Sequence, residues 1–335
     1  MSNSFSYHVT KYFAEYLPLH LGVSKNTCRS YRDAFVLFLG FMESQYGIHP
    51  DKVTLDVLDL SVVESFLVHL EEKRGAGVST RNHRLAAIHS FFRYLQRKEV
   101  THFERCSRIL AIPFKKCPSV EMSYLSLDET RILLSMPNPR SKRGMRELAM
   151  LSTLYETGAR VQELVDITVS HLHLSSTTPC VDLRGKGNKL RRIPISEDVA
   201  EILRKYMDCH HIAVAQDIVF PNNRGEKLTR AGVQYIIDKN IALAKKQSPD
   251  MFRQKITNHS FRHSKAMHLL EAGVNLVYIR DFLGHSSVVI TEIYAKTNPE
   301  IKRKLLTENS MSGTACECYS AQDRNDLLDW LKNTL

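Results

Sequence analysis

Apolar and polar positions alternate with a helical period along residues 1–100. In the segment 26–42, bulky side chains recur every three or four positions: Tyr31, Phe35, Phe38 and Leu39. The spacing returns twice more, in Leu58, Val62, Phe66, Leu67 and Leu70 and then in Leu85, Ile88, Phe92 and Leu95. Ser24 and Ser79 are suitable N-caps for two of these helices. The pattern predicts a helical bundle with a core of its own.

The periodicity is lost between residues 101 and 122. This segment contains two prolines, which remove helix donors, and a cluster of cations: Arg105, Arg108, Lys115 and Lys116. Both features are typical of an extended basic linker. Helical patterning resumes at Ser126, which begins a capping box with Glu129. One exception follows, because residues 181–184 and 191–195 have strand character around the turn pair Gly187-Asn188. The fold class predicted is mainly α with a small β-hairpin or sheet.

Length and composition fit two globular domains. The chain has 335 residues, of which 43% are hydrophobic and 24% charged, and its formal charge is +10. Lys and Arg outnumber Asp and Glu by 16 to 11 in residues 1–117 and by 28 to 21 in residues 118–310, while the segment 311–335 is acidic. Two basic lobes on a basic linker suit a polyanion such as DNA, although charge alone does not exclude an ordinary basic protein.

The same composition excludes other classes. The seven cysteines are scattered and odd in number, so free thiols in a reducing compartment are expected. No apolar run is long enough to span a membrane, and the first residues lack the core of a signal peptide. We therefore expect a soluble intracellular protein.

Few motifs carry chemistry by themselves. Gly185-Lys186-Gly187 is not a phosphate loop, because it lies in the predicted hairpin and lacks the Walker spacing. His259 and His263 have metal-ligand spacing, but Ser260 stands where a zinc hydrolase needs Glu and no third ligand is evident. We expect no metal. Arg262 lies on the same side of the helix as His259, and such a pair can donate to one phosphodiester.

Three further residues are ambiguous when taken singly. Arg160 follows a glycine that permits a helix break, so it can head a new helix, yet a lone arginine there is usually a surface residue. His285 follows Gly284 at the end of a helical run, where a histidine is most often a cap. Tyr294 lies among apolar residues and can belong to a core.

Taken in order, these residues resemble the tyrosine recombinase (phage integrase) family, including the Xer-type chromosome recombinases. The resemblance covers residues 5–305. The matching segments are Gly158-Ala159-Arg160-Val161-Gln162-Glu163-Leu164, Gly185-Lys186-Gly187-Asn188-Lys189, His259-Ser260-Phe261-Arg262-His263-Ser264, His268-Leu269-Leu270-Glu271-Ala272-Gly273-Val274, Leu283-Gly284-His285-Ser286-Ser287 and Ile293-Tyr294-Ala295.

The chain also departs from the family pattern. Lys265 stands where the family usually has an apolar or aromatic residue, and Phe261 replaces the commoner Leu. Lys265 and the segment 291–296 are more similar to integrases of mobile elements than to chromosome-dimer resolvases.

The resemblance implies a catalytic set. Arg160, Arg262 and His285 would stabilise charge on the non-bridging oxygens of a DNA phosphodiester. Tyr294 would attack and form a 3′-phosphotyrosyl bond, with His259 assisting the transfer of its proton. Lys186, favoured over Lys189 by the motif, would protonate the 5′-oxygen as it leaves. No cofactor and no metal are implied.

The resemblance also implies an organisation. Residues 1–105 would form a helical N-terminal core DNA-binding domain, 106–122 a basic interdomain linker, 123–310 the mixed, mostly α catalytic domain and 311–335 a C-terminal tail. The two domains would close as a clamp on a double-stranded recombination site, with two protomers per site and a tetramer at synapsis. We expect the DNA contacts to include six cations: Arg81, Arg84, Arg105, Arg108, Lys115 and Lys116. The location expected is the cytoplasm of a bacterium, in association with its nucleoid.

Several alternatives remain open at this point. The fold could belong to a catalytically silent DNA-binding accessory protein, or to an enzyme that nicks and reseals DNA like a type IB topoisomerase. The segment 298–308 has one apolar face, which the family uses to pack against a neighbouring protomer. The amphipathic tail could cover that face when DNA is absent, or be an ordinary capping helix. The sequence names neither the target site nor any accessory protein.

Overall fold

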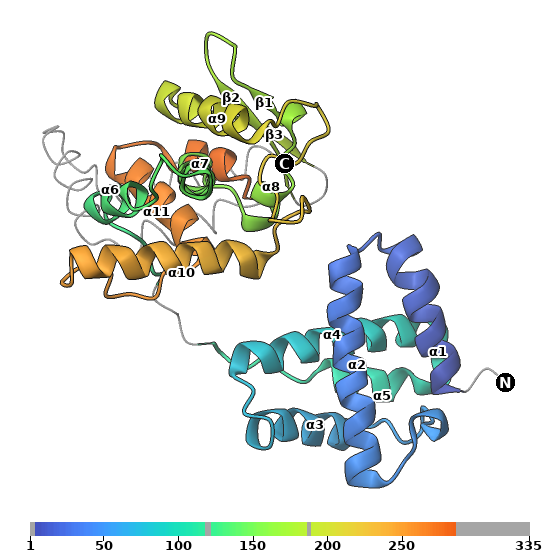
Figure 1. Cartoon of the computed structure of the whole chain (residues 1–335). Coiled ribbons are helices and arrows are strands. Elements are labelled where there is room, and N and C mark those ends of the chain that lie inside the picture. The colour runs from blue at the N-terminus through green and yellow to red at the C-terminus, as the bar shows by residue number, and fades with distance from the viewer. Residues whose placement is uncertain (1–3, 118–121, 186–188, 286–335) are drawn as a thin grey trace, which may run out of the picture. The chain divides into compact units, whose positions relative to one another are not determined.

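The computed structural model describes residues 4–117, 122–185 and 189–285, and the chain divides into two compact units at residues 120 and 121 (Figure 1). Lys186, the turn pair Gly187-Asn188, Tyr294 and the predicted segments 298–308 and 311–335 lie outside the described residues. Within the described part of the chain, no helix is long and apolar enough to cross a bilayer.

The first unit is helical, as its periodicity predicts. Its elements are α1 (Phe5–Lys11), the π-helical segment η1 (Tyr12–His20), α2 (Lys25–Tyr46), η2 (Pro50–Lys52), α3 (Leu60–Glu72), α4 (Val78–Lys98), η3 (Val100–His102) and α5 (Phe103–Leu110). Ser24 caps α2 by accepting a hydrogen bond from the amide of Thr27 at 3.2 Å, which confirms that N-cap. The prediction for Ser79 is wrong, because Gly77 is the N-cap of α4 and Ser79 lies in its first turn.

Aromatic side chains fill the core of this unit. Phe35 and Phe91 meet edge to face at 5.2 Å between ring centroids, and Phe38 and Phe66 do so at 5.1 Å. Each of these rings is at most 4% exposed. Burying one such side chain contributes about 1.5–3 kcal/mol, so the bundle has the separate core that the sequence predicts.

The predicted extended linker is wrong for its first half. Residues 103–110 form α5 instead, and the predicted boundary after residue 105 falls inside this helix. Cys106 and Ile109 are fully buried, while Arg105 is partly exposed and Arg108 exposed. The two apolar side chains, three residues apart, form a buried face that packs this helix against α4 and α3. In the sequence the cations next to them make this short apolar pattern easy to mistake for a polar linker. Of the predicted linker residues that the structure describes, 112–117 and 122 have neither helix nor strand.

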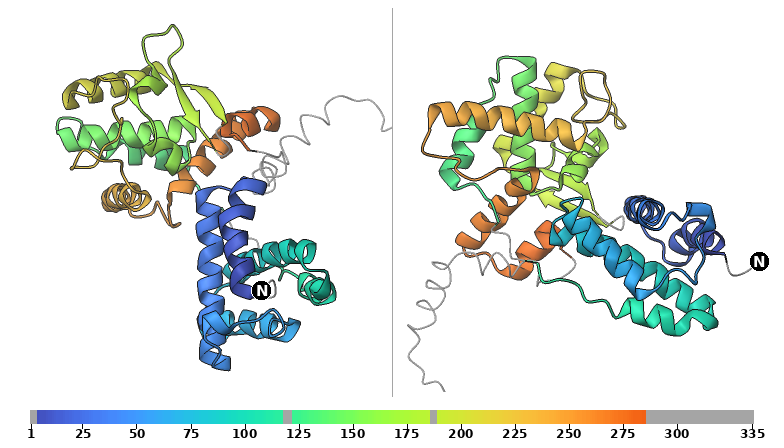
Figure 2. Two further views of the ribbon diagram at one scale, coloured as in Figure 1. Left: turned by 90° about the vertical axis from the view of Figure 1, so that its right-hand side faces the viewer. Right: turned by 90° about the horizontal axis from the view of Figure 1, so that it is seen from below.

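The second unit is built around one central helix. Its elements are α6 (Leu127–Ser135), α7 (Lys142–Thr157), α8 (Val161–Val165), η4 (Val169–His171), β1 (Leu172–His173), β2 (Cys180–Arg184), β3 (Leu190–Pro194), α9 (Glu197–His210), α10 (Arg230–Gln247), α11 (Asn258–Glu271) and α12 (Leu276–Leu283). The capping box of Ser126 and Glu129 at the start of α6 is confirmed. Helix α7 packs against α6, α8, α9 and α11, and α10 lies on the side of α7 away from the sheet (Figures 1 and 2).

The predicted hairpin is present as β2 and β3, which pair antiparallel, and a short strand β1 extends the sheet in the order β1-β2-β3. The register pairs Leu183 with Arg191 and Asp182 with Arg192. Because successive side chains of a strand point to opposite faces of the sheet, Arg191 and Arg192 lie in different surroundings.

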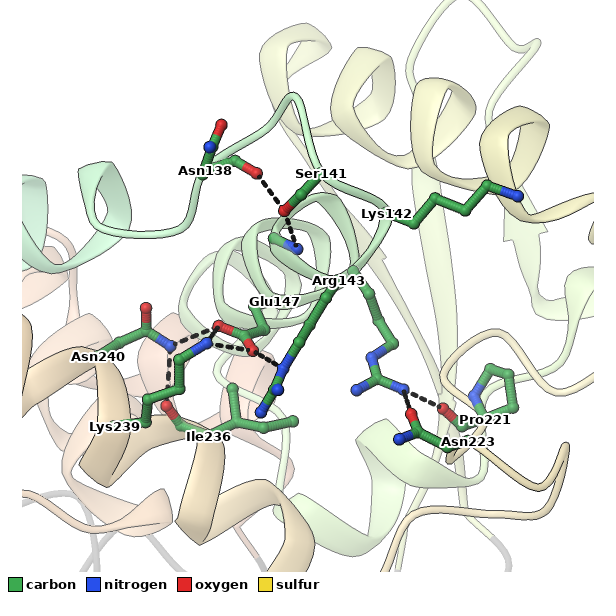
Figure 3. A network of polar contacts seen from close by, with 12 residues as sticks. Asn138, Ser141, Lys142, Arg143, Glu147, Pro221, Asn223, Ile236, Lys239 and Asn240 are labelled. Atoms are coloured by element: carbon green, nitrogen blue, oxygen red, sulfur yellow. Dashed lines mark hydrogen bonds and ion pairs between the residues drawn. The ribbon is translucent and has the colours of Figure 1, made fainter.

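A buried carboxylate holds α7 to α10. Glu147 is 1% exposed and accepts hydrogen bonds from Lys239 Nζ at 2.8 Å, Asn240 Nδ2 at 3.1 Å and Arg143 Nε at 3.1 Å (Figure 3). Burial opposes ionisation of this group, but the donors outweigh it and hold the pKa of Glu147 below its ordinary value. The network fixes α10, whose first residue, Arg230, lies near the candidate site described next.

Candidate active site

Arg160 is placed by a sharp turn between two helices. Helix α7 ends at Thr157, and Gly158 adopts a left-handed conformation with φ +56° that a side chain would strain. Arg160 is then the N-cap of α8, so of the two alternatives left by the sequence it is the one that heads a new helix. Its backbone amide donates to Glu163 Oε2 and its Nη1 to Glu163 Oε1, both at 2.8 Å. The guanidinium is thus oriented by a carboxylate one turn away.

Arg262 ties this turn to the end of α12. It projects from α11, is 3% exposed, and donates from Nη1 to the carbonyl of Gly158 at 2.8 Å and from Nη2 to the carbonyl of Leu283. The two backbone segments it binds directly precede Arg160 and His285. A guanidinium has five N–H groups, so binding two carbonyls is compatible with donating to a phosphate as well.

His285 lies beside both arginines. Helix α12 ends at Gly284, which has φ +67°, and the amide of His285 donates to the carbonyl of Arg280 at 3.0 Å. Burial and then the charges of Arg262 and Arg160 lower the pKa of His285 to about 4. The imidazole is therefore neutral near pH 7 and can donate one N–H without adding charge.

His259 completes the group from the first turn of α11. Burial and the charges of Arg262 and Arg160 lower its pKa below the ordinary value. His263, one turn further, is a near neighbour with 6.4 Å between the ring centroids. Among the residues that the structure describes, no group of three or more His, Cys, Asp or Glu side chains could hold a metal ion.

The structure thus brings together four of the six side chains predicted from the sequence: Arg160, His259, Arg262 and His285. The other two, Lys186 and Tyr294, lie outside the described residues, and their roles stay predictions. Gly185, directly before Lys186, lies at this site, since a Cβ on it would be 3.2 Å from Glu163 Oε1.

Sequence reasoning missed three residues that shape the site. Glu163 stood within a motif but was given no role, although it orients Arg160. Arg191 of β3 forms a two-bonded ion pair with the same Glu163. Arg230 at the start of α10 donates to Gln162 Oε1 at 3.3 Å, and its charge also lowers the pKa of His259. An arginine on the buried face of a strand was the signal that could have identified Arg191.

Lys265, the departure from the family pattern, joins α11, which carries Arg262, to the end of α7 just before the Arg160 turn. Its Nζ lies 3.0 Å from Glu156 Oε2 and 5.1 Å from the ring centroid of Tyr155, both near the end of α7. Both side chains of the ion pair are mostly buried. A cation is therefore accommodated at this position by an acidic partner on α7.

The six cations predicted to contact DNA have partners of different kinds. Arg81 is 6% exposed and donates to the carbonyl of Pro113 at 3.1 Å, and Arg84 donates to the carbonyl of Ser30. Three of the cations form ion pairs within the first unit, Arg105 with Asp56, Arg108 with Glu104 and Lys115 with Glu71, and Lys116 is exposed. DNA contact by these residues stays a prediction.

Two arginines and two histidines converge here from three elements of a helical unit, and donors of this kind suit a phosphate or a similar oxyanion. Residues 123–300 match the phage integrase family, and residues 10–99 match the phage integrase N-terminal SAM-like domain. The chain belongs to the phage integrase family, the tyrosine recombinases.

Several relatives extend over most of the chain. It is 34% identical to the integrase/recombinase y4rC of Sinorhizobium fredii, covering 89% of this chain and 90% of that protein. It is 31% identical to the tyrosine recombinase XerD of Vibrio cholerae, covering 86% of this chain and 91% of XerD. Among solved structures, the Tn1549 transposon integrase in complex with transposon right-end DNA has the same fold, with a TM-score of 0.69, 17% identity and coverage of 90% of this chain and 98% of that one.

Proposed function

We propose that this chain is a site-specific DNA recombinase that cuts and rejoins strands through a 3′-phosphotyrosyl intermediate on Tyr294. The convergence of Arg160, Arg262 and His285 carries this proposal. A phosphodiester is anionic, and attack on it builds further charge on its two non-bridging oxygens. Oriented donors that require little rearrangement during the reaction stabilise that charge.

The proposed cleavage is balanced in bonds and protons. The Tyr294 phenolic oxygen attacks phosphorus, the bond to the 5′-oxygen breaks, and the strand is left as a phosphotyrosyl ester and a 5′-hydroxyl. His259 takes up the phenolic proton, which suits an imidazole that is neutral at the pH of the reaction. Lys186 supplies the proton to the departing 5′-oxygen. Attack by a 5′-hydroxyl of another duplex reverses each step, so the rejoining needs no nucleotide.

The assembly is proposed on the family resemblance. The helical N-terminal unit and the catalytic unit, which begins at residue 121, would bind double-stranded DNA as a clamp, with two protomers on each site and four at synapsis. The segment 311–335 would be a tail outside the clamp. The similarity of Lys265 and residues 291–296 to integrases of mobile elements supports a role in moving DNA, in association with a bacterial nucleoid.

The test is a nicked duplex that traps the covalent complex, because the short strand beyond the cleavage point diffuses away. The binding site is first selected from random duplexes with the purified full-length protein. Wild type should form an adduct that survives denaturation, whereas Tyr294→Phe should form none and keep its DNA affinity within about 3-fold, since phosphate contacts dominate affinity.

The outcomes separate the alternatives. Binding without an adduct would indicate a DNA-binding accessory protein, and relaxation of supercoiled DNA without strand exchange would indicate a topoisomerase. The matched control is Tyr278 on α12, which is 72% exposed. An adduct that persists in Tyr294→Phe but is lost in Tyr278→Phe would assign the nucleophile to Tyr278.

A further inference from the structure

Arg191 lies at the junction of the segments that carry the site. It occupies β3, and its side chain is 10% exposed. Its neighbour Arg192 points to the other face of the sheet and binds Asp182 at 2.8 Å. Arg191 and Arg192 thus each form an ion pair with a carboxylate. The pair of Arg191 is at the candidate site, and that of Arg192 is on the other face of the sheet.

The partner of Arg191 is the carboxylate that orients Arg160. Arg191 Nη1 donates to Glu163 Oε1 at 3.0 Å and Nη2 to Glu163 Oε2 at 2.6 Å. Each of these oxygens also accepts one hydrogen bond from Arg160. Glu163 has a side chain only 4% exposed, so its position is set by these two arginines. Movement of Arg191 would therefore be transmitted to Arg160 through one shared group.

The other side of Arg191 lies against backbone. A Cβ on Gly284 would be 2.9 Å from Arg191 Nη1 and 3.2 Å from its Cδ, and a Cβ on Gly185 would be 3.2 Å from Nη1. These glycines directly precede His285 and Lys186. Only a residue without a side chain allows such an approach, so the guanidinium is packed against the segment leading into His285.

We propose that Arg191 is a positioning residue of the cleavage reaction, which holds the Arg160 turn and the segment before His285 in register through Glu163 and Gly284. This inference rests on the proposed function and extends it to a residue that does not touch the phosphate. The planar fork of arginine binds both oxygens of Glu163 at once, which a lysine cannot do. The expected loss is therefore in the rate of cleavage and not in DNA affinity.

The experiment compares Arg191→Gln with the matched variant Arg192→Gln in single-turnover cleavage of the nicked duplex. Misplacement of catalytic groups by about 1 Å can cost about 100-fold in rate, and we expect a loss of that order for Arg191→Gln. DNA affinity should stay within about 3-fold, because it depends on phosphate contacts spread over the chain. Arg192→Gln should cleave within about 3-fold of wild type, because its ion pair lies on the other face of the strand.

Two further variants distinguish positioning from a general loss of structure. Arg191→Lys keeps the charge but not the fork, and should recover part of the rate, leaving a deficit of about 10-fold. The double variant Glu163→Gln/Arg191→Gln should cleave less than about 3-fold more slowly than Glu163→Gln alone, because the effects of residues that act as one unit are not additive. Arg191→Lys also serves as the test if Arg191→Gln does not fold.

The proposal is overturned if Arg191→Lys cleaves like wild type, if Arg191→Gln and Arg192→Gln lose the same activity, or if the losses from Glu163→Gln and Arg191→Gln multiply. Wild type is measured in parallel. A wild-type protein that forms no adduct would contradict the proposed function itself, an outcome distinct from a failure confined to Arg191.

Discussion

At the scale of single residues, burial and neighbouring groups keep the histidines of the site neutral near pH 7. His285 and His263 both have a pKa lowered to about 4, by burial first and then by neighbouring cationic or titratable groups. A neutral imidazole beside two arginines can donate or accept a hydrogen bond without adding to their repulsion. A DNA phosphate would bring a further negative charge to these cations.

This arrangement predicts a loss of stability in acid. Histidines of the unfolded chain titrate near the ordinary value of about 6.5, so between about pH 6.5 and 4 the unfolded state binds more protons than the folded state. The free energy of unfolding should fall as the pH is lowered through this window, by at most about 1.4 kcal/mol per pH unit for each such histidine.

Urea unfolding followed by circular dichroism at several pH values tests this. His263→Gln should flatten the dependence, because it removes one of the groups that must be protonated. His49→Gln is the control, since His49 is an exposed residue of the first unit and not one of the buried histidines of the site. An equally steep dependence in His263→Gln would contradict the assignment.

At the scale of elements, two glycines end helices in the same conformation but in different surroundings. Gly158 after α7 and Gly273 after α11 both have a positive φ, of +56° and +81°. A Cβ on Gly158 would lie 2.9 Å from Leu283 Cδ2, whereas one on Gly273 would meet nothing within 4 Å. Alanine at either position incurs backbone strain, but only at Gly158 does it also force the buried side chain of Leu283 on α12 to shift.

Gly273→Ala should therefore lower stability by about 1 kcal/mol and leave cleavage unchanged. Gly158→Ala should be more destabilising, by about 2 kcal/mol or more, because it adds overpacking to the strain. It should also slow cleavage, since Arg262 binds the carbonyl of Gly158. Thermal unfolding and single-turnover cleavage of the two variants provide the comparison, and equal effects would show that the contact with α12 is unimportant.

The sequence predicts elements well where one residue pattern determines them. The helix periods, the caps at Ser24 and Ser126 and the hairpin of β2 and β3 are all confirmed by the structure. Helix α5 was missed because its few apolar positions are surrounded by cations. Strand β1, of two residues, is too short to have a period and exists through its pairing with β2.

The candidate site likewise contains residues that the sequence identifies and a contact that it does not. The order of Arg160, His259, Arg262 and His285 in the chain identified them by resemblance, and the structure brings them together. The ion pair of Arg191 with Glu163 could not be predicted, because the two residues are 28 positions apart and meet only after β3 has docked beside α8. Tertiary partners of this kind are absent from any local pattern.

At the scale of the whole molecule, the net charge of +10 predicts DNA binding that weakens steeply with salt. The logarithm of the binding constant should fall linearly with the logarithm of salt concentration, with a slope of about 0.9 for each phosphate neutralised. Tyr294→Phe should keep the wild-type slope, because the nucleophile is uncharged.

The slope of the salt dependence can also show which of the cations predicted to contact DNA bind a phosphate. Lys116 is exposed, and Lys116→Gln should reduce the slope by about one if this residue binds a phosphate. Arg81 is 6% exposed and holds the carbonyl of Pro113, so Arg81→Gln should lower the unfolding temperature and leave the slope unchanged. Fluorescence anisotropy over a salt series on the selected duplex measures both variants. A reduced slope in Arg81→Gln with an unchanged unfolding temperature would mean that this arginine leaves Pro113 to bind DNA, and that the segment 112–117 is rearranged in the complex.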